Sequence, residues 1–279
     1  MPEVRRKRRS RRNRNAERSP AAPTAPAYLT RNIPFYEILD EEGLQTIEHN
    51  AETVLEEIGI DFKDDPEALD IWKKAGAEVQ GERVRIPRGF CRQTIAEHAP
   101  FQFTQHARNA ERNVVIGGKH TVLAPAYGSP FVRNLDEGRR YATIEDFRNF
   151  VKLAYLSPHL HHSGGTVCEP VDLPVNKRHL DMLYAHMRYS DKPYRGSVTA
   201  AERAEDTVEM SRILFGDRFQ DPQTGEARTV TTSLINANSP MSFDATMLGA
   251  LKVYARNNQA CLISPFILAG AMSPVTIMG

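Results

Sequence analysis

Cysteine is scarce in this chain, and its placement supports neither crosslinks nor a structural metal. Only three cysteines occur among the 279 residues, at Cys91, Cys168 and Cys261. No CxxC pair is present, so neither a disulfide framework nor a structural zinc site is indicated. Free thiols at wide spacing fit a reducing compartment. We therefore expect a cytoplasmic protein.

Long uncharged stretches and targeting signals are nearly absent as well. The basic N-terminus leads into Ser, Pro and Ala instead of the apolar core of a secretory signal. One uncharged run, 260–279, is about long enough to cross a bilayer. Serine and proline interrupt it, so we interpret it as buried strand and loop and expect no membrane association.

The chain has almost no net charge, at +1, yet its charges are unevenly placed. Residues 1–18 hold nine basic and two acidic side chains, so the rest of the chain is net acidic. Residues 1–27 are basic and then Pro/Ala-rich, and we expect a disordered tail because they can bury little apolar surface. Such a tail could bind nucleic acid, as a non-catalytic scaffold would. It lacks aromatic side chains for base stacking, which favours a solvated tail and makes nucleic-acid binding an unfavoured alternative.

Common catalytic signatures are missing. The sequence has no P-loop, GxGxxG, HExxH or GxSxG, so nucleotide, zincin and common serine-hydrolase chemistries lack support. His159, His161 and His162 resemble the His-x-His ligands of barrel metallohydrolases. They precede a predicted strand, at the end opposite the expected site. We therefore favour structural histidines over a metal-dependent barrel hydrolase and predict no metal ligands.

Residues 28–118 combine helical and strand patterns. Asp40 is a predicted N-cap for a helix that stops at Gly59, and Asp65 caps a shorter helix that ends at Gly76. Short alternating runs follow at 83–87, 101–105 and 114–117. We expect a small α+β region without a recognisable chemical motif.

From about Lys119 the pattern becomes a regular series of strands and helices. Strand-like runs end at Pro125–Tyr127, Val167–Glu169, Ser197–Thr199, Ile235–Asn238 and Ile263–Pro265. The ends are spaced as in βα units, which indicates an α/β fold with a parallel sheet; the even spacing favours a TIM-type (β/α) barrel.

Helix starts fill the gaps between these strands. Thr143 with Asp146 and Thr199 with Glu202 have capping-box spacing, and another helix is predicted to start near Ser242.

A complete barrel needs eight units and about 250 residues. We therefore expect residues 119–279 to form the first four to five units of a (β/α)8 barrel and the chain to be the N-terminal part of a longer protein.

In such barrels the carboxyl ends of the strands carry the active site. Five residues at these ends are the predicted substrate contacts: Tyr127, Glu169, Asn236, Asn238 and Phe266. Aromatic faces with a carboxylate suit a quaternary or tertiary ammonium, which donates few hydrogen bonds. The two asparagines, beside a helix N-terminus, suit an anion. Core packing of the rings and a simple turn and cap at the asparagines are the alternatives. No catalytic residue is identified.

Long segments of the chain resemble a known family. They include LTRNIPFYEILDEEGLQTIEHNAETVLEEIGIDF, GSPFVRNLDEGRRYATIEDFRNFVKLAYLSP, GGTVCEPVDLP and INANSPMSFDATMLGALKVYARNNQ. These are similar to the trimethylamine methyltransferase family, over nearly everything from Tyr28 to Gly279. The family includes pyrrolysine-containing trimethylamine enzymes and relatives without pyrrolysine that demethylate betaines.

The resemblance implies a TIM barrel that binds a methylated amine, either trimethylamine or a betaine such as glycine betaine. It also implies a partner corrinoid protein, whose cobalamin Co(I) takes the methyl group, and no cofactor bound directly to this chain. We further expect a homo-oligomer. Displacement by Co(I) requires orientation and desolvation and no protein nucleophile. The pyrrolysine position of the trimethylamine enzymes lies outside this sequence.

Overall fold

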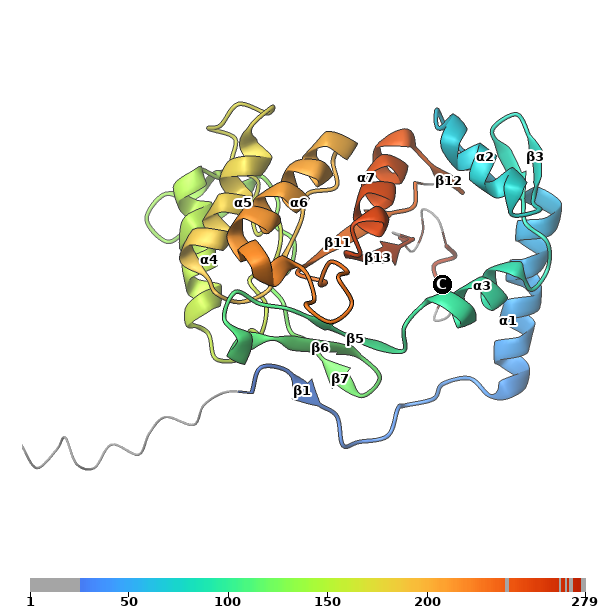
Figure 1. Cartoon of the computed structure of the whole chain (residues 1–279), viewed down its shortest axis with the longest axis horizontal. Helices are drawn as coiled ribbons and strands as arrows, with labels where there is room; N and C mark the ends of the chain where they lie inside the picture. Colours follow the sequence, from blue (N-terminus) through green and yellow to red (C-terminus); the bar gives the residue numbers. More distant parts are fainter. Residues whose placement is uncertain (1–25, 239–240, 266, 269, 271–272, 277–279) are drawn as a thin grey trace, which may run out of the picture.

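A computed structural model describes most of the chain (Figure 1). The described residues are 26–238, 241–265, 267–268, 270 and 273–276. The predicted disordered tail lies outside them except for its last two residues, and so does Phe266. No helix in these described ranges is both long enough and apolar enough to span a membrane.

Helices α1 to α3 belong to the N-terminal part of the chain. They are α1 (Glu41–Thr53), continued by the π-helical η2 (Val54–Ile58), α2 (Pro66–Lys74) and α3 (Phe90–His98). The side chains of Asp40 and Asp65 cap α1 and α2, as predicted. Gly59 ends η2 with φ 78°, and a Cβ there would lie 2.4 Å from the carbonyl oxygen of Val84. The close backbone approach requires glycine.

A small mixed sheet packs beside these helices, in the order β12-β2-β4-β3. Its strands are β2 (Ile60–Phe62), β3 (Glu78–Gln80), β4 (Arg83–Arg85) and β12 (Ser242–Phe243). Three strands come from the N-terminal region, whereas β12 comes from far along the chain and pairs in parallel with β2. Phe62, Val84 and Leu248 are buried together in the core of this unit. The N-terminal region is therefore joined to the rest of the protein through a shared sheet and core.

An antiparallel sheet forms the base of the molecule in Figure 1, in the order β1-β7-β6-β5. Its strands are β1 (Leu29–Thr30), β5 (Gln102–Gln105), β6 (Val114–Gly117) and β7 (His120–Thr121); the short 3-10 helix η3 (Ala110–Arg112) connects β5 and β6. The buried side chain of Gln105 donates hydrogen bonds to the carbonyl oxygens of Tyr194 and Val230. These carbonyls lie at the amino ends of two parallel strands, so this sheet covers that end of the parallel sheet.

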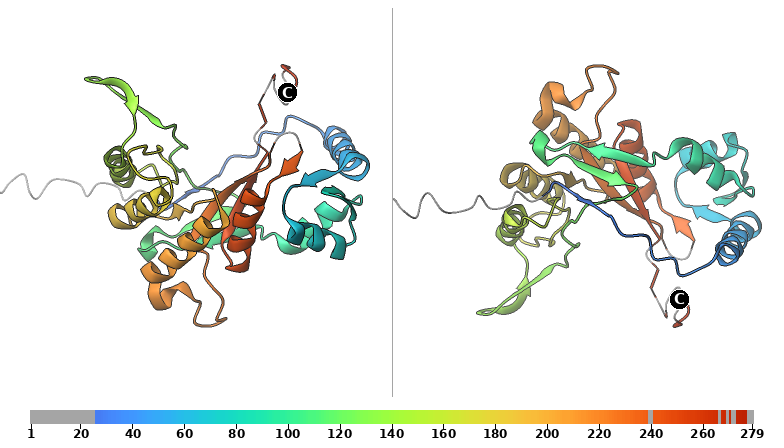
Figure 2. Two further views of the ribbon diagram at one scale, coloured as in Figure 1. Left: turned by 90° about the horizontal axis from the view of Figure 1, so that it is seen from above. Right: turned by 90° about the horizontal axis from the view of Figure 1, so that it is seen from below.

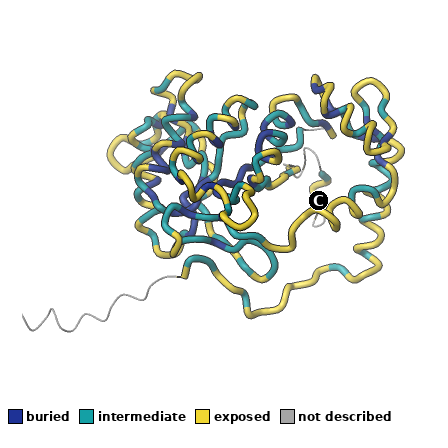
Figure 3. The backbone as a smooth tube through the Cα atoms, viewed as in Figure 1, coloured by how far each residue is buried: buried dark blue, intermediate teal, exposed yellow. Residues whose placement is uncertain are grey.

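The parallel sheet has the order β10-β11-β13. Its strands are β10 (Tyr194–Arg195), β11 (Thr231–Asn236) and β13 (Ala260–Ser264), and the adjoining helices are α4 (Ile144–Leu156), α5 (Arg178–Tyr189), α6 (Ala201–Phe215), η4 (Gly216–Phe219) and α7 (Ala245–Arg256). Helices α6 and α7 pack on one face, over a core that includes Val208, Val230, Ile235 and Tyr254. Figure 2 shows these helices beside the strands, and Figure 3 shows the dark, buried path of β11.

Backbone hydrogen bonds extend this sheet by two further segments. The amide of Arg195 donates to the carbonyl of Gly164 at 2.9 Å, and that of Ser163 donates to Pro193 at 2.8 Å. Farther out, Gly128 donates to Thr166 at 2.8 Å. Five segments thus lie side by side in sequence order, as the spacing predicted. The described residues form no closed barrel.

The remaining hairpin, β8 (Phe131–Asn134) with β9 (Gly138–Tyr141), leads into α4. Thr143 and Asp146 form the predicted capping box there. The capping box predicted at Thr199 is wrong. The backbone of Ala200 is still extended, so α6 begins one residue later without a side-chain cap. The hydroxyl oxygen of Thr199 instead accepts a hydrogen bond from Arg203.

Candidate functional site

The parallel sheet has two chemically different faces at the level of β10, which is aligned with the first residues of β11. The hydroxyl of Tyr194 lies 2.8 Å from that of Ser211 on α6. A Cβ on Gly196 would lie 2.3 Å from the hydroxyl of Tyr254 on α7. Both residues therefore face the helices. Because side chains alternate along a strand, Arg195 between them projects to the opposite, inner face.

Arg195 meets Tyr127 from the first of the five segments. Its guanidinium carbon lies 5.6 Å from the centroid of the Tyr127 ring, within cation–π range. Burial raises the pKa of the Tyr127 phenol, while the charge and hydrogen bonding of Arg195 act in the opposite direction. The phenol is therefore neutral at neutral pH and can donate a hydrogen bond. Tyr127 keeps 43% of its surface exposed, so a ligand can reach it.

Gly165 makes this meeting of side chains sterically feasible. A Cβ at this position would lie 2.9 Å from the Tyr127 hydroxyl oxygen and 3.1 Å from Cβ of Arg195. Contacts this short would push one of the two side chains away. Gly165, the second glycine of the GGT sequence, therefore has a packing role at the site.

Two hydrogen-bond donors in this area have no acceptor among the described residues. Nε of Arg195 and Nε2 of His162 are both buried without a partner. Nδ1 of His162 accepts a hydrogen bond from the amide of Gly164 at 2.9 Å, so the neutral ring carries its proton on Nε2. Burial lowers the pKa of His162 well below its usual value, and the charge of Arg195 lowers it further. His162 is thus a neutral donor near a cation.

Of the two predicted acidic and aromatic partners of Tyr127, only Glu169 is among the described residues. Glu169 is exposed, and its carboxylate accepts a hydrogen bond of 2.6 Å from Arg178 at the start of α5. Phe266 lies outside the described residues. The ring of Tyr127 contacts the guanidinium of Arg195, and its contact with a substrate stays a prediction.

The two predicted asparagines, Asn236 and Asn238, lie in different elements and make different contacts. Asn236 ends β11 and is aligned with Ser264 of β13. Asn238 is in the following turn, where its Nδ2 donates to Asp244, the N-cap of α7, at 2.7 Å. The backbone amide of Asn238 also donates to the carbonyl oxygen of Ser242, so the residue takes part in the turn before α7; its substrate contact stays a prediction.

Register places Asn236 well above Arg195 on the inner face. Arg195 is aligned with Thr232, and Asn236 is four residues farther along β11. At about 3.3 Å per residue, this corresponds to roughly 13 Å toward the carboxyl end. Asn236 is therefore near the rim, while Arg195 and Tyr127 lie deeper.

The histidine cluster is built into the backbone hydrogen-bond network. Nδ1 of His161 accepts from the amide of Leu123 at 3.0 Å, much as His162 accepts from Gly164. Within the described ranges, no three His, Cys, Asp or Glu side chains are grouped so as to hold a metal ion. Cys168 is buried, as predicted for a core thiol, and burial raises its pKa to about 12.

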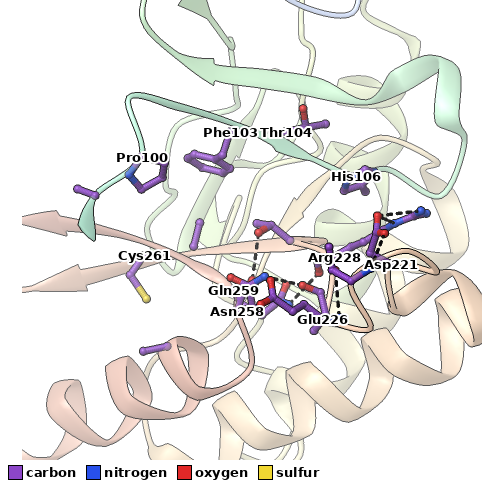
Figure 4. A pocket seen from close by; sticks show the side chains of 16 residues that line it. Pro100, Phe103, Thr104, His106, Asp221, Glu226, Arg228, Asn258, Gln259 and Cys261 are labelled. Carbon is purple, nitrogen blue, oxygen red and sulfur yellow. Dashed lines mark hydrogen bonds and ion pairs between the residues drawn. The ribbon is translucent and has the colours of Figure 1, made fainter. Parts of the chain in front are cut away.

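A cleft of about 750 Å³ lies at the opposite end of the strands. Figure 4 shows Phe103 and His106 of the base facing Arg228 and Gln259 across it. The polar groups are engaged: Arg228 pairs with Asp221 at 3.3 Å, and Gln259 accepts from the amide of Val230 at 2.9 Å. This cleft is at the amino ends of β11 and β13. In barrel-type sheets that end serves stability.

The sequence pattern did not indicate Arg195, and it indicated a structural role for His162. The third strand was predicted to end at Ser197–Thr199, beyond Arg195. The available signal was a lone arginine inside the short strand of KPYRGS, flanked by residues that face the helices. Its direction follows only from the contacts of its neighbours.

This combination defines a class of protein: a mixed α/β chain with successive parallel strands and a polar inner face. The family model described as trimethylamine methyltransferase (MTTB) matches residues 5–279. The chain belongs to this family.

Three characterised relatives are similar to the chain. A glycine betaine methyltransferase of Desulfitobacterium hafniense (strain Y51) is 44% identical over 247 residues, which cover 88% of this chain and 50% of the relative. A proline betaine:corrinoid methyltransferase of Eubacterium limosum is 29% identical, with 81% and 47% covered. An L-carnitine:corrinoid methyltransferase of Eubacterium limosum is 24% identical, with 84% and 54% covered. The chain spans about half the length of these relatives.

Proposed function

We propose that the protein transfers a methyl group from a betaine to the Co(I) of a corrinoid carried by a partner protein. We propose glycine betaine as the preferred substrate. Family membership supports the reaction class. The relative named for glycine betaine is the most similar of the three described above. Glycine betaine, proline betaine and carnitine are all quaternary ammonium compounds with a carboxylate.

The observation that favours a betaine over trimethylamine is the uncompensated charge of Arg195. Trimethylamine is a cation at neutral pH and is repelled by this guanidinium. A betaine is a zwitterion whose carboxylate is attracted to it. The described residues place no carboxylate within ion-pair distance of Arg195, and Glu169 is already paired with Arg178.

The work of the protein in this reaction is orientation and desolvation. When the partner is docked, its Co(I) supplies the nucleophile that accepts the methyl group. The inner face holds the substrate so that one N–CH3 bond points along the line of attack, and it excludes water from the cation. We propose that Tyr127, Asn236, Asn238, Glu169 and Phe266 contribute to this substrate pocket or its rim.

We also propose that the complete protein is a TIM barrel preceded by the α+β region 28–118. The five parallel segments in sequence order, with helices following the strands, support residues 119–279 as its first units. Three free cysteines support a reducing, cytoplasmic location. Exposed apolar side chains at Ile33, Tyr36 and Ile38 support a homo-oligomer, which analytical ultracentrifugation would test.

The reaction can be tested with protein made from the complete coding sequence. It is incubated with a corrinoid protein reduced to Co(I) and separately with glycine betaine, proline betaine, carnitine and trimethylamine. Methylation of the corrinoid is followed by its visible absorption, and the demethylated amine by mass spectrometry. We expect dimethylglycine from glycine betaine. Transfer from trimethylamine alone, or from none of the four, would contradict the proposal.

The role of Asn238 is tested in the same assay. Asn238→Ala removes the amide whose buried Oδ1 has no partner among the described residues. We expect slower methyl transfer. A wild-type rate with every amine would refute a substrate role and leave Asn238 as a turn residue.

A further inference from the structure

The inner face contains a cation that nothing in the described structure neutralises. Arg195 is half-buried, and its Nε is sealed from solvent without a hydrogen-bond partner. Leaving a buried donor of a charged group unpaired costs free energy, because the hydrogen bond that it made to water is not replaced. Such a group is stable in a binding site when a ligand supplies the missing acceptor.

The groups described around Arg195 are neutral, and two of them can donate a hydrogen bond to a ligand. Nε2 of His162 is a second buried donor without an acceptor, and its ring is held neutral by the Gly164 amide and by burial. The phenol oxygen of Tyr127 interacts with the Arg195 side chain, and its raised pKa keeps a proton on the oxygen that the phenol can donate to a ligand. A cation with two neutral donors beside it matches a carboxylate, which accepts several hydrogen bonds and donates none.

The position of Arg195 along its strand predicts how a bound zwitterion is oriented. Arg195 lies roughly 13 Å below Asn236 in register, toward the interior of the sheet. A carboxylate held at Arg195 therefore leaves the other end of a small zwitterion pointing toward the carboxyl ends of the strands. That is the end from which a partner can approach in barrel-type folds.

We propose that Arg195 is the carboxylate anchor of the substrate site and sets its specificity for amines that also carry a carboxylate. This inference rests on the proposed function, because it names how the same site selects its substrate. His162 and Tyr127 complete the anchor as neutral donors. The methylated nitrogen then lies on the rim side, where its methyl group is accessible to the acceptor.

The test separates binding from methyl transfer. Glycine betaine and choline share the trimethylammonium group, but choline has a hydroxyl in place of the carboxylate. Calorimetry measures the Kd of each for the full-length wild type, Arg195→Gln and Arg195→Lys. Arg148→Gln, on the exposed face of α4 and paired with Glu145, is the matched control.

We expect Arg195→Gln to weaken glycine betaine binding by at least about 30-fold and to change choline binding by less than about threefold. Arg195→Lys keeps the charge but loses the bidentate fork, so it should recover part of the loss. The control variant should bind both ligands as the wild type does. Melting temperatures of all variants report whether the fold is intact; if Arg195→Gln does not fold, Arg195→Lys still reports through its glycine betaine-to-choline ratio.

Each outcome separates the two ideas. Wild-type methyl transfer with an unchanged ratio of Kd values in both Arg195 variants overturns the anchor and leaves the proposed function standing. If the Arg195 variants selectively lose glycine betaine binding but the wild type transfers no methyl group, the result supports the anchor and contradicts the proposed reaction. Failure of the wild type to bind glycine betaine would overturn both.

Discussion

Lys252 on α7 forms an ion pair with Asp65, the N-cap residue of α2, with Nζ 2.8 Å from each carboxylate oxygen. Asp65 is buried and Lys252 mostly so, and the two residues are 187 positions apart in sequence. The same lysine reaches Glu67 in the first turn of α2. This contact ties the N-terminal region to the helix that covers β11 and β13. It complements the sheet shared by β12 and β2.

Replacing this lysine should weaken the junction between the two parts. We expect Lys252→Met to lower the free energy of unfolding by about 2–3 kcal/mol, because Asp65 is left buried without its counter-charge. Lys74→Met, which removes an exposed i,i+4 pair with Asp70, should cost less than about 0.5 kcal/mol. Urea unfolding measures both. Equal, small losses would show that the buried pair does not hold the junction.

A second buried lysine stabilises the end of α4. Nζ of Lys192 donates hydrogen bonds to the carbonyl oxygens of Ala154, Ser157 and Leu160 at 2.6–2.9 Å. The carbonyls of Ala154 and Ser157 are at the C-terminal end of α4, where intrahelical donors are missing, and that of Leu160 is in the segment that follows. Lys192→Met should therefore cost about 2–4 kcal/mol, while Lys177→Met, at an exposed pair with Asp181, should be nearly neutral. A loss for Lys192→Met no larger than for this control would contradict the assignment.

Two threonines with the same sequence pattern should respond differently to truncation. The hydroxyl of Thr143 accepts from the amide of Asp146, whereas Thr199 caps nothing. We expect Thr143→Ala to cost about 1 kcal/mol and Thr199→Ala only a few tenths. Thermal unfolding of the two variants side by side gives the comparison. Equal costs would mean that the capping interaction at Thr143 contributes nothing measurable.

This contrast shows what the sequence could and could not predict about the fold. Helix starts at Asp40, Asp65 and Thr143 depend on side chains that accept from amides three residues away, so local patterns were sufficient. At Thr199 the same local pattern failed, because the extended backbone of Ala200 shifted the start of α6. The fourth helix begins at Ala245 because the residues predicted to start it pair with β2 instead. That pairing spans about 180 residues and leaves no local signature.

The site was predictable only in outline. Tyr127 was found because it follows a strand-like run, and the structure gives it a neighbour on the inner face. Arg195 was missed because a two-residue strand shows no periodicity; its direction depends on Tyr194 and Gly196 meeting the helices. The pairing of Glu169 with Arg178 likewise depends on how α5 is placed.

Buried histidines should make the protein less stable in acid. His186 lies between the hydroxyl of Ser163 at 2.6 Å and the carbonyl of Gly165 at 2.8 Å. Burial lowers its pKa to about 4, so the folded state binds fewer protons than the unfolded state between about pH 6.5 and 4. The contribution of His186 to the free energy of unfolding is therefore fully present above pH 6.5 and is lost as the pH falls toward 4.

Removing the imidazole should flatten this dependence. In His186→Gln the slope of unfolding free energy against pH, measured by urea titration between pH 7 and 4.5, should fall by up to about 1.4 kcal/mol per pH unit. His162 also has a lowered pKa, so part of the slope remains. His98→Gln, at an exposed position, is the control. Identical slopes in all three proteins would show that His186 does not titrate between the two states.

The contact of Tyr127 with Gly165 can be tested by a double-mutant cycle. Gly165→Ala places a Cβ 2.9 Å from the Tyr127 hydroxyl oxygen, which must move, and we expect a cost of about 1–3 kcal/mol in unfolding free energy. Tyr127→Phe deletes that oxygen and leaves the next ring atom at 3.2 Å. In the phenylalanine background the alanine should therefore cost less, by at least about 0.5 kcal/mol. If the unfolding free-energy costs of Gly165→Ala and Tyr127→Phe simply add, the Tyr127 hydroxyl does not contact Gly165. That result would contradict the placement of Tyr127 beside Arg195.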